Sequence, residues 1–168
     1  MNEIEYDGNI FLLPKEPGDA CLVTTNGMVR KDGKAVMGAG IAKYCRDNFA
    51  GVDRILGEKL KSHGNHVHYL GGIWTVTGGN VRFMLFSFPT KHDWKDGSDP
   101  ELIRQSCREM MRLADAYKTG TVYMPCPGCS NGRLDYWTDV RPILERELDD
   151  RFTVCIPARI MGMKKDCP

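Results

Sequence analysis

The chain has 168 residues, of which 23 are Lys or Arg and 22 are Asp or Glu, so its formal charge at pH 7 is +1. This length is typical of a single domain, 1–168, and the charge provides no global basic field of the kind that nucleic-acid-binding proteins use. No apolar run approaches the roughly 18 residues of a membrane span, and the acidic start Met1-Asn2-Glu3 differs from a signal peptide, so we expect a cytoplasmic protein without membrane association.

Strand-like and helix-like patterns alternate along nearly the whole chain. Strands are predicted, in chain order, at 20–24, 66–70, 73–77, 82–88, 121–124 and 153–156. Helices are predicted at 41–49, 52–62, 100–117 and roughly 137–148. This alternation predicts a three-layer α/β/α sandwich around a mixed, mainly parallel central sheet.

Some boundaries follow from particular residues. Asp99 before Pro100 supplies the N-cap and first-turn signals of the third helix, and Pro142 places the N-cap of the last helix near 137–139. The glycine pairs at 71–72 and 78–79 predict tight turns and an antiparallel excursion of the chain. We also expect a polar surface loop over 91–99 and a loose tail over 161–168.

Two glycine-bearing loops, 37–42 and 127–132, lie where a strand is followed by a helix. Glycine lets a backbone approach a ligand closely, and a helix that begins behind such a loop directs free N–H groups toward an anion. Two such loops in one chain predict a single phosphate-rich ligand held from both sides.

The predicted strand ends deliver further polar groups to the same edge of the sheet. Ligands of such folds bind outside the carboxyl ends of the strands, where we expect 25–27, 89–91 and 125–132 to converge. These segments contain amides, a lysine, a serine and glycine N–H groups. Such groups can bind the hydroxyls of a ribose and the oxygens of a diphosphate. The residues expected at this edge include no Ser-His-Asp set, carboxylate pair or metal-binding cluster, so neither a metal nor a cofactor is expected.

Three other interpretations fit less well. A dinucleotide-binding fingerprint would have a third glycine where Lys43 stands, and a nucleotide-kinase loop would have a hydroxyl where Ala35 follows Lys34. Cys126 and Cys129 have the spacing of a zinc or redox pair, but no second such pair completes a zinc site, and a plain turn explains them.

Three segments resemble the signatures of the macrodomain family, in the same order and over most of the chain. They are 21–27 with 36–42, then 87–94, then 127–137. The most similar branch holds the terminal ADP-ribose protein glycohydrolases and the antitoxin macrodomains that remove ADP-ribose from DNA. Similar stand-alone proteins occur in bacteria and phages. The resemblance implies a macrodomain-like fold with an ADP-ribose cleft, in a protein that we expect to be monomeric.

The resemblance also implies roles for individual residues. Asn9 and Ile10 would meet the adenine, and Asn26 would bind the distal ribose. The two phosphate loops would be formed by two groups of neighbouring residues: Gly38, Ala39, Gly40 and Ile41 in the first, and Gly128, Cys129, Ser130, Asn131, Gly132 and Arg133 in the second. The segment 28–35 is an insertion, which we expect to form a basic flap beside the distal ribose.

The implied activity is hydrolysis at C1″ of the distal ribose, which removes ADP-ribose from DNA, from protein or from a small derivative. Lys91 matches the lysine that acts at the anomeric carbon, Asn26 lies beside it, and Asp135 is a candidate general acid or base that would otherwise only shape a turn. The partner carboxylate of the protein glycohydrolases falls at Gly132, and the DNA-directed antitoxins also have glycine there. The alternatives are a reader that binds ADP-ribose without cleaving it and an ADP-ribose 1″-phosphate phosphatase.

Aromatic and basic side chains near the expected cleft have two interpretations. They could stack on the bases and neutralise the phosphates of a nucleic acid, or they could belong to the core and to the rim of the cleft. These residues are Trp94, Lys95, Arg133, Tyr136 and Trp137. Packing explains Trp137, whereas Trp94 is the better functional candidate because it lies in a polar loop.

Overall fold

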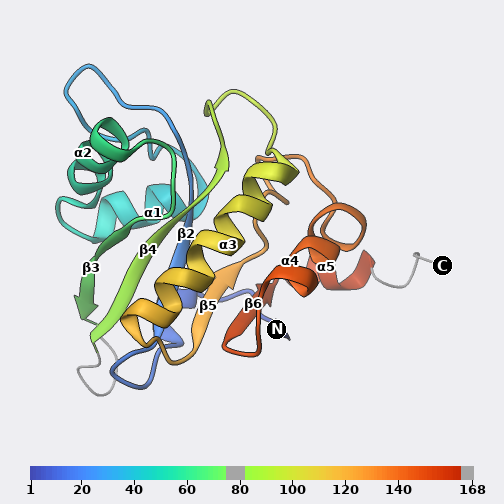
Figure 1. Ribbon diagram of the computed structural model, residues 1–168. Coiled ribbons are helices and arrows are strands. Elements are labelled where there is room, and N and C mark those ends of the chain that lie inside the picture. Colours follow the sequence, from blue (N-terminus) through green and yellow to red (C-terminus); the bar gives the residue numbers. More distant parts are fainter. Residues whose placement is uncertain (75–81, 164–168) are drawn as a thin grey trace.

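We describe residues 1–74 and 82–163 of a computed structural model of the chain (Figure 1). A six-stranded sheet lies at its centre, with the strands in the order β1-β6-β5-β2-β4-β3. The strands are β1 (Asn2–Glu5), β2 (Ala20–Asn26), β3 (Tyr69–Trp74), β4 (Arg82–Lys91), β5 (Val122–Pro125) and β6 (Phe152–Ile156). All neighbouring pairs are parallel except β3 and β4, which are antiparallel. The predicted mixed, mainly parallel sheet is therefore confirmed.

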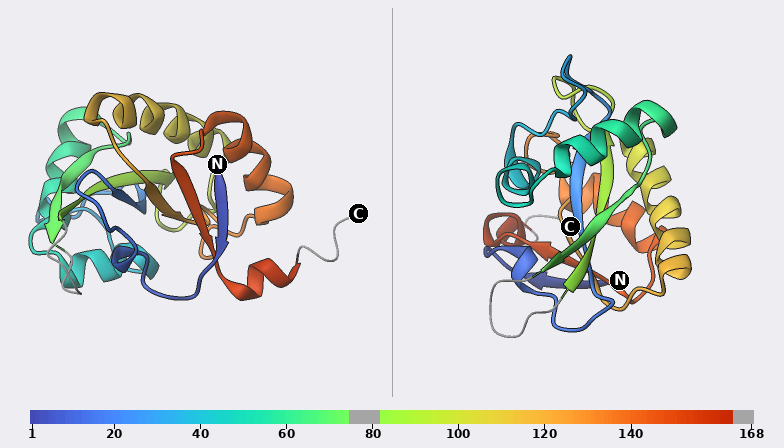
Figure 2. Two further views of the ribbon diagram at one scale, coloured as in Figure 1. Left: turned by 90° about the horizontal axis from the view of Figure 1, so that it is seen from below. Right: turned by 90° about the vertical axis from the view of Figure 1, so that its left-hand side faces the viewer.

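The helices lie on both faces of this sheet, as Figure 2 shows from two directions. They are η1 (Ile10–Leu12), α1 (Gly40–Asn48), α2 (Val52–His63), α3 (Pro100–Tyr117), η2 (Tyr136–Val140), α4 (Arg141–Glu147) and α5 (Ala158–Met161). Helices α1 and α2 pack on one face, and α3 and α4 cover the other. The three-layer α/β/α sandwich is thus as predicted.

The alternation of side chains along β2 explains why both faces are covered. Ala20 and Leu22 belong to the hydrophobic core under α3 and α4, whereas Cys21 and Val23 belong to the core under α1 and α2. All four are fully buried. A strand that is apolar on both sides must be covered on both sides, because successive side chains point to opposite faces.

Several predicted elements differ from the observed ones. The first predicted turn is wrong, because Gly71 and Gly72 lie inside β3, where the pairing with β4 shifts register. The second predicted turn and most of the strand at 73–77 lie outside the described residues. The first part of the predicted strand at 66–70 is a loop, in which His68 is buried.

The last part of the chain also departs from the prediction. The helix expected from 137 begins one residue earlier, as the π-helical turn η2, and its N-cap is Asp135 rather than a residue of 137–139. Strand β1 and the short helices η1 and α5 were not predicted. Met161, which was expected to open a loose tail, is the last residue of α5, and 164–168 lie outside the described residues. Within 1–74 and 82–163, none of the helices combines the length and the apolar character needed to cross a bilayer.

Candidate functional site

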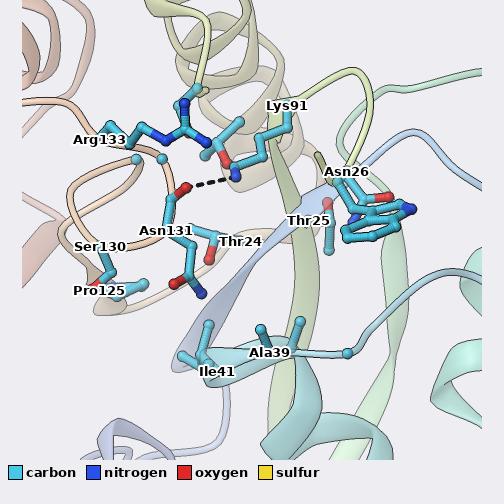
Figure 3. Close-up of a pocket in the computed structure, with 18 of the residues that line it drawn as sticks. Thr24, Thr25, Asn26, Ala39, Ile41, Lys91, Pro125, Ser130, Asn131 and Arg133 are labelled. Atoms are coloured by element: carbon cyan, nitrogen blue, oxygen red, sulfur yellow. Dashed lines mark hydrogen bonds between the residues drawn. The ribbon is translucent and has the colours of Figure 1, made fainter. Parts of the chain in front are cut away.

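A cleft of about 920 Å³ opens at the carboxyl edge of the sheet (Figure 3). The three adjacent strands β5, β2 and β4 end there, and their last residues, Pro125, Asn26 and Lys91, all line it. The volume falls within the range of small-molecule sites, roughly 300–1,000 Å³. The structure therefore brings together the three strand ends that the sequence analysis expected to converge.

One wall of the cleft is the glycine loop that leads into α1. Gly38, Ala39, Gly40 and Ile41 all line the cleft. Gly40 has a φ of +54°, a backbone conformation that favours glycine. The N-cap residue Ala39 offers no side-chain hydrogen bond, so the N–H groups of the first turn of α1 keep their capacity to bind an anion.

The opposite wall is the loop at 128–133. A Cβ placed on Gly40 would lie 3.9 Å from Nδ2 of Asn131, so the two glycine loops face one another across the cleft. Arg133 has a φ of +64°, and its backbone N–H donates to the carbonyl of Ser130 over 3.3 Å. Five predicted ligand-binding residues of this loop line the cleft: Gly128, Ser130, Asn131, Gly132 and Arg133. Two walls of glycine and backbone groups are the arrangement that a diphosphate requires.

Lys91 lies between the strand ends and the second loop. Its ammonium group Nζ donates to the backbone carbonyl of Asn131 over 2.7 Å, as Figure 3 shows. Burial lowers the pKa of Lys91, the positive charge of Arg133 lowers it further, and Asp96 opposes the change. A larger fraction of this amine is therefore neutral at a given pH than for a free lysine.

Asn26 uses part of its amide to hold the backbone of the insertion at 28–35. Its Oδ1 accepts from the N–H of Met28, and its Nδ2 donates to the carbonyl of Val36, both over 3.0 Å. One N–H and one acceptor position stay available to a ligand. Two of the three cations of the insertion pair with α2: Arg30 and Lys34 each lie 3.5 Å from the carboxylate of Asp53.

Four predicted site residues are not part of the lining of this cleft: Asn9, Ile10, Cys129 and Asp135. The Oδ1 of Asn9 caps η1, and its Nδ2 donates to the hydroxyl of Tyr44 over 2.7 Å. Ile10 is buried in the core under α1 and α2. Cys129 and Asp135 line a separate pocket of about 300 Å³.

The carboxylate of Asp135 acts as a helix cap in this structure. It accepts from the N–H of Thr138 over 2.9 Å, and this hydrogen bond is the main cause that lowers the pKa of Asp135. An acceptor engaged in this way, with its proton affinity reduced, is poorly suited to donate a proton at C1″. We therefore assign no catalytic role to Asp135.

Among the described residues, no Asp or Glu lines the cleft. The position of the family's partner carboxylate, Gly132, has no room for a side chain, because a Cβ there would clash with Oγ of Ser98 and the carbonyl of Gly128. The N–H of Ser98 donates to the carbonyl of Gly132 over 2.9 Å, which fixes this close approach. The chemistry of this cleft must therefore proceed without a lining carboxylate.

The two cysteines near the cleft are protonated thiols rather than thiolates. Burial raises the pKa of Cys126, and it raises that of Cys129 to about 12. Their Sγ atoms donate to the carbonyls of Cys155 and Pro127, respectively. In the part of the chain that the structure describes, no group of three or more His, Cys, Asp or Glu could hold a metal ion.

Sequence reasoning missed residues that support the site from outside the glycine loops. Ser98 lines the cleft, and Asn65 donates from Nδ2 to the carbonyl of Lys91 over 2.9 Å. The position of Ser98, directly before the helix cap Asp99, was a usable signal, because the loop that leads into α3 starts at the same sheet edge. No sequence signal pointed to Asn65, because it lies 26 residues before Lys91, its hydrogen-bond partner.

The described fold is similar to solved macrodomain structures. No protein-family model matches the chain, and no curated protein sequence matches it. The macrodomains of Mycobacterium tuberculosis DarG and Thermus aquaticus DarG superpose with TM-scores of 0.64 and 0.63, at 20% and 21% identity. These two matches cover 92% and 93% of this chain and 97% and 96% of those chains.

A third solved structure is Thermosipho africanus DarTG in complex with ADP-ribose. It has a TM-score of 0.65 and 20% identity, and the match covers 83% of this chain. This chain spans 38% of that longer protein. Each of the three likenesses covers more than four fifths of this chain, and the chain therefore has the fold of the DarG macrodomains.

Proposed function

We propose that the cleft binds ADP-ribose and that the protein hydrolyses the bond at C1″ of the distal ribose, with Lys91 as the nucleophile. The observation that carries the proposal is the position of the Lys91 amine, which lies against the Asn131 carbonyl in a cleft lined by both glycine loops. The fold likeness to a DarTG structure in complex with ADP-ribose supports the choice of ligand.

The ligand would lie across both loops. N–H groups at the start of α1 and in the loop 128–133 would hold the two phosphates, and the free amide positions of Asn26 would hold hydroxyls of the distal ribose. This binding energy fixes C1″ near Lys91. The neutral amine then attacks C1″ while the bond to the leaving group breaks, and water afterwards releases the sugar from the lysine.

The proposal is tested by combining calorimetry with turnover assays on three proteins. Lys91→Ala should bind free ADP-ribose nearly as well as the wild type but lose turnover of ADP-ribosylated DNA or protein by at least roughly 100-fold. Lys91→Arg keeps the positive charge without a neutral amine, so a nucleophilic role predicts the same loss. Lys15→Ala, which removes an exposed lysine outside the cleft, is the matched control.

Each of the other outcomes identifies a different function. If the wild type binds ADP-ribose without turning over any substrate, the protein is a reader. If Lys91→Arg stays active, the lysine contributes charge rather than a nucleophile. Release of inorganic phosphate from ADP-ribose 1″-phosphate, followed in the same samples, would identify a phosphatase. If the wild type does not bind free ADP-ribose, the ligand assignment is wrong.

A further inference from the structure

The insertion at 28–35 and the residue after it, Val36, form a small hairpin between β2 and α1. Val29 and Ala35 form an antiparallel bridge, and the N–H of Val36 donates to the carbonyl of Met28 over 2.9 Å. An isolated two-stranded hairpin is only marginally stable in water, so this one requires support from another element. We refer to residues 28–36 as the hairpin.

Asp53, near the start of α2, contacts the hairpin with both its backbone and its side chain. Its carbonyl accepts from the N–H of Ala35 over 2.8 Å, where the hairpin runs beside α2 in Figure 1. Its buried carboxylate lies 3.5 Å from Arg30 and 3.5 Å from Lys34. A buried carboxylate is costly without partners of opposite charge, and the hairpin supplies two of them. The hairpin and α2 therefore stabilise one another.

Gly57, in the middle of α2, allows the hairpin to approach the helix closely. Glycine is unfavourable inside a helix, because fixing its backbone costs more conformational freedom than for any other residue. A Cβ at this position would lie 2.9 Å from the backbone N of Ala35 and would clash with the carbonyl oxygen of Gly33. Both are backbone atoms, which cannot turn aside as the end of a flexible side chain can. A side chain at position 57 would therefore push the hairpin away from α2.

The side chain of Asn26 joins the two arms of the hairpin at its base. Its Oδ1 accepts from the N–H of Met28 on one arm, and its Nδ2 donates to the carbonyl of Val36 on the other, both over 3.0 Å. An amide that is held at both ends has a fixed orientation, so its remaining N–H and acceptor position face fixed directions. The hairpin therefore sets the orientation of this amide at the edge of the cleft.

We propose that Gly57 and Asp53 are positioning residues for the distal ribose, because they hold the hairpin and the hairpin holds the amide of Asn26. Neither residue lines the cleft, so each acts through Asn26 rather than by touching the ligand. The inference rests on the proposed function, in which Asn26 binds hydroxyls of the distal ribose. Loosening the hairpin should therefore weaken the binding of ADP-ribose and spare that of ADP, which has no distal ribose.

Calorimetry with ADP-ribose and with ADP measures this difference. Gly57→Ala should weaken the binding of ADP-ribose by roughly 3- to 10-fold, the cost of ordering one released side chain, and leave that of ADP within about twofold. Asp53→Asn removes the charge that pairs with the hairpin, so it should act in the same direction, and it replaces Gly57→Ala if that variant folds poorly. Gly162→Ala is the matched control, because a Cβ there meets nothing within 4 Å and the backbone is helical.

A double-mutant cycle tests whether Gly57 acts through Asn26. Asn26→Ala should weaken the binding of ADP-ribose relative to ADP by roughly 5- to 50-fold, because two hydrogen-bonding positions are lost. Adding Gly57→Ala to Asn26→Ala should then change the ratio of the two affinities by less than about twofold. Losses that multiply would show that Gly57 acts on the cleft by another route and would overturn the inference.

Amide hydrogen exchange follows the hairpin without any ligand. In Gly57→Ala, the N–H groups of Met28 and Ala35 should exchange at least roughly tenfold faster than in the wild type, because their acceptors lie on Asn26 and Asp53. The N–H groups of α3 should keep their exchange rates. Unchanged exchange at Met28 and Ala35 would show that the hairpin does not depend on its contact with Gly57.

Two further results separate this inference from the proposed function. Equal weakening of ADP and ADP-ribose by Gly57→Ala would overturn the positioning role, since it would show a general effect on the cleft. A wild type that binds neither ligand would instead remove the ligand assignment, and the exchange rates would still report whether α2 holds the hairpin. Turnover does not enter these measurements, so a reader of ADP-ribose would give the same ratios as a hydrolase.

Discussion

At the scale of single residues, the charges around Lys91 set how much of its amine is available for attack. A nucleophilic amine must be neutral, and the pKa of Lys91 is lowered by burial first and by Arg133 second. Asp96 is the opposing group, since its negative charge favours the ammonium form. The two neighbours therefore act on Lys91 in opposite directions, which makes its role testable by pH.

We expect kcat to rise with pH as Lys91 loses its proton, with the midpoint of the rise at a lower pH than for an ordinary lysine. Arg133→Gln removes a nearby positive charge, which raises the pKa of Lys91 and moves the rise in kcat to higher pH. Asp96→Asn removes the opposing carboxylate and moves it to lower pH. The measurement is kcat at saturating substrate across pH, so that weaker binding does not enter. Shifts of both variants in one direction would contradict a nucleophilic Lys91.

At the scale of elements, the sequence predicted the helices and strands that are marked by local signals, such as capping residues and apolar stripes. The bounds of α3 were predicted to the residue, because Asp99 and Pro100 mark its start and one apolar stripe runs along it. Strand β1 has four residues, none of them buried and only Ile4 apolar, so it has no apolar run to detect. The π-helical start of the last helix depends on the cap by Asp135, which no periodicity reveals. Gly71 and Gly72 predicted a turn, yet tertiary pairing with β4 keeps them in a strand.

In the candidate site, too, features with a local sequence signal were predicted and contacts set by the tertiary structure were not. The two glycine loops and Lys91 were predicted because strand-loop-helix order places them at one sheet edge. Asn9 was placed near the ligand only by resemblance, and Asp135 was a candidate as the nearest spare carboxylate. Their side chains cap η1 and η2 in the structure. Contacts such as Asn65 with Lys91 join segments that no sequence pattern links.

The loop before α1 offers a test at this scale, because Gly38 has no structural need to be glycine. A Cβ there would meet nothing within 4 Å, and its φ is not in the left-handed region. If a diphosphate occupies that space, Gly38→Val should weaken the binding of free ADP-ribose by at least roughly tenfold, about 1.4 kcal/mol. The free energy of unfolding should change by less than about 0.5 kcal/mol.

Calorimetry with ADP-ribose and urea unfolding measure these two quantities. Gly162→Val is the matched control, because Gly162 also has open space around it and lies outside the cleft. Equal affinity in the Gly38 and Gly162 variants would show that the ligand does not approach this loop.

At the scale of the whole molecule, the cleft depends on how the chain crosses the sheet. β2 lies at the centre, with β4 on one side and β5 on the other, and the connections after β2 and β5 pack on different faces. Such a switch in direction opens a crevice at the carboxyl edge of a parallel sheet. The site is therefore shared between segments near residues 24–42, 90–98 and 125–133, each held by its own strand.

The lack of a lining carboxylate predicts which bonds the protein cleaves. Within the described residues, no Asp or Glu lines the cleft, and the contact of Gly132 with Ser98 leaves no room for a side chain at position 132. Leaving groups that depart as delocalised anions, such as a carboxylate or an imide nitrogen of a nucleobase, need no such proton, whereas an alkoxide does. We expect ADP-ribose on glutamate or on a nucleobase to be released at least roughly 100-fold faster than ADP-ribose on serine, measured as kcat with peptides and oligonucleotides of equal length. Comparable kcat values for the serine-linked substrate would require an acid that this cleft does not contain, and would contradict the mechanism based on Lys91 alone.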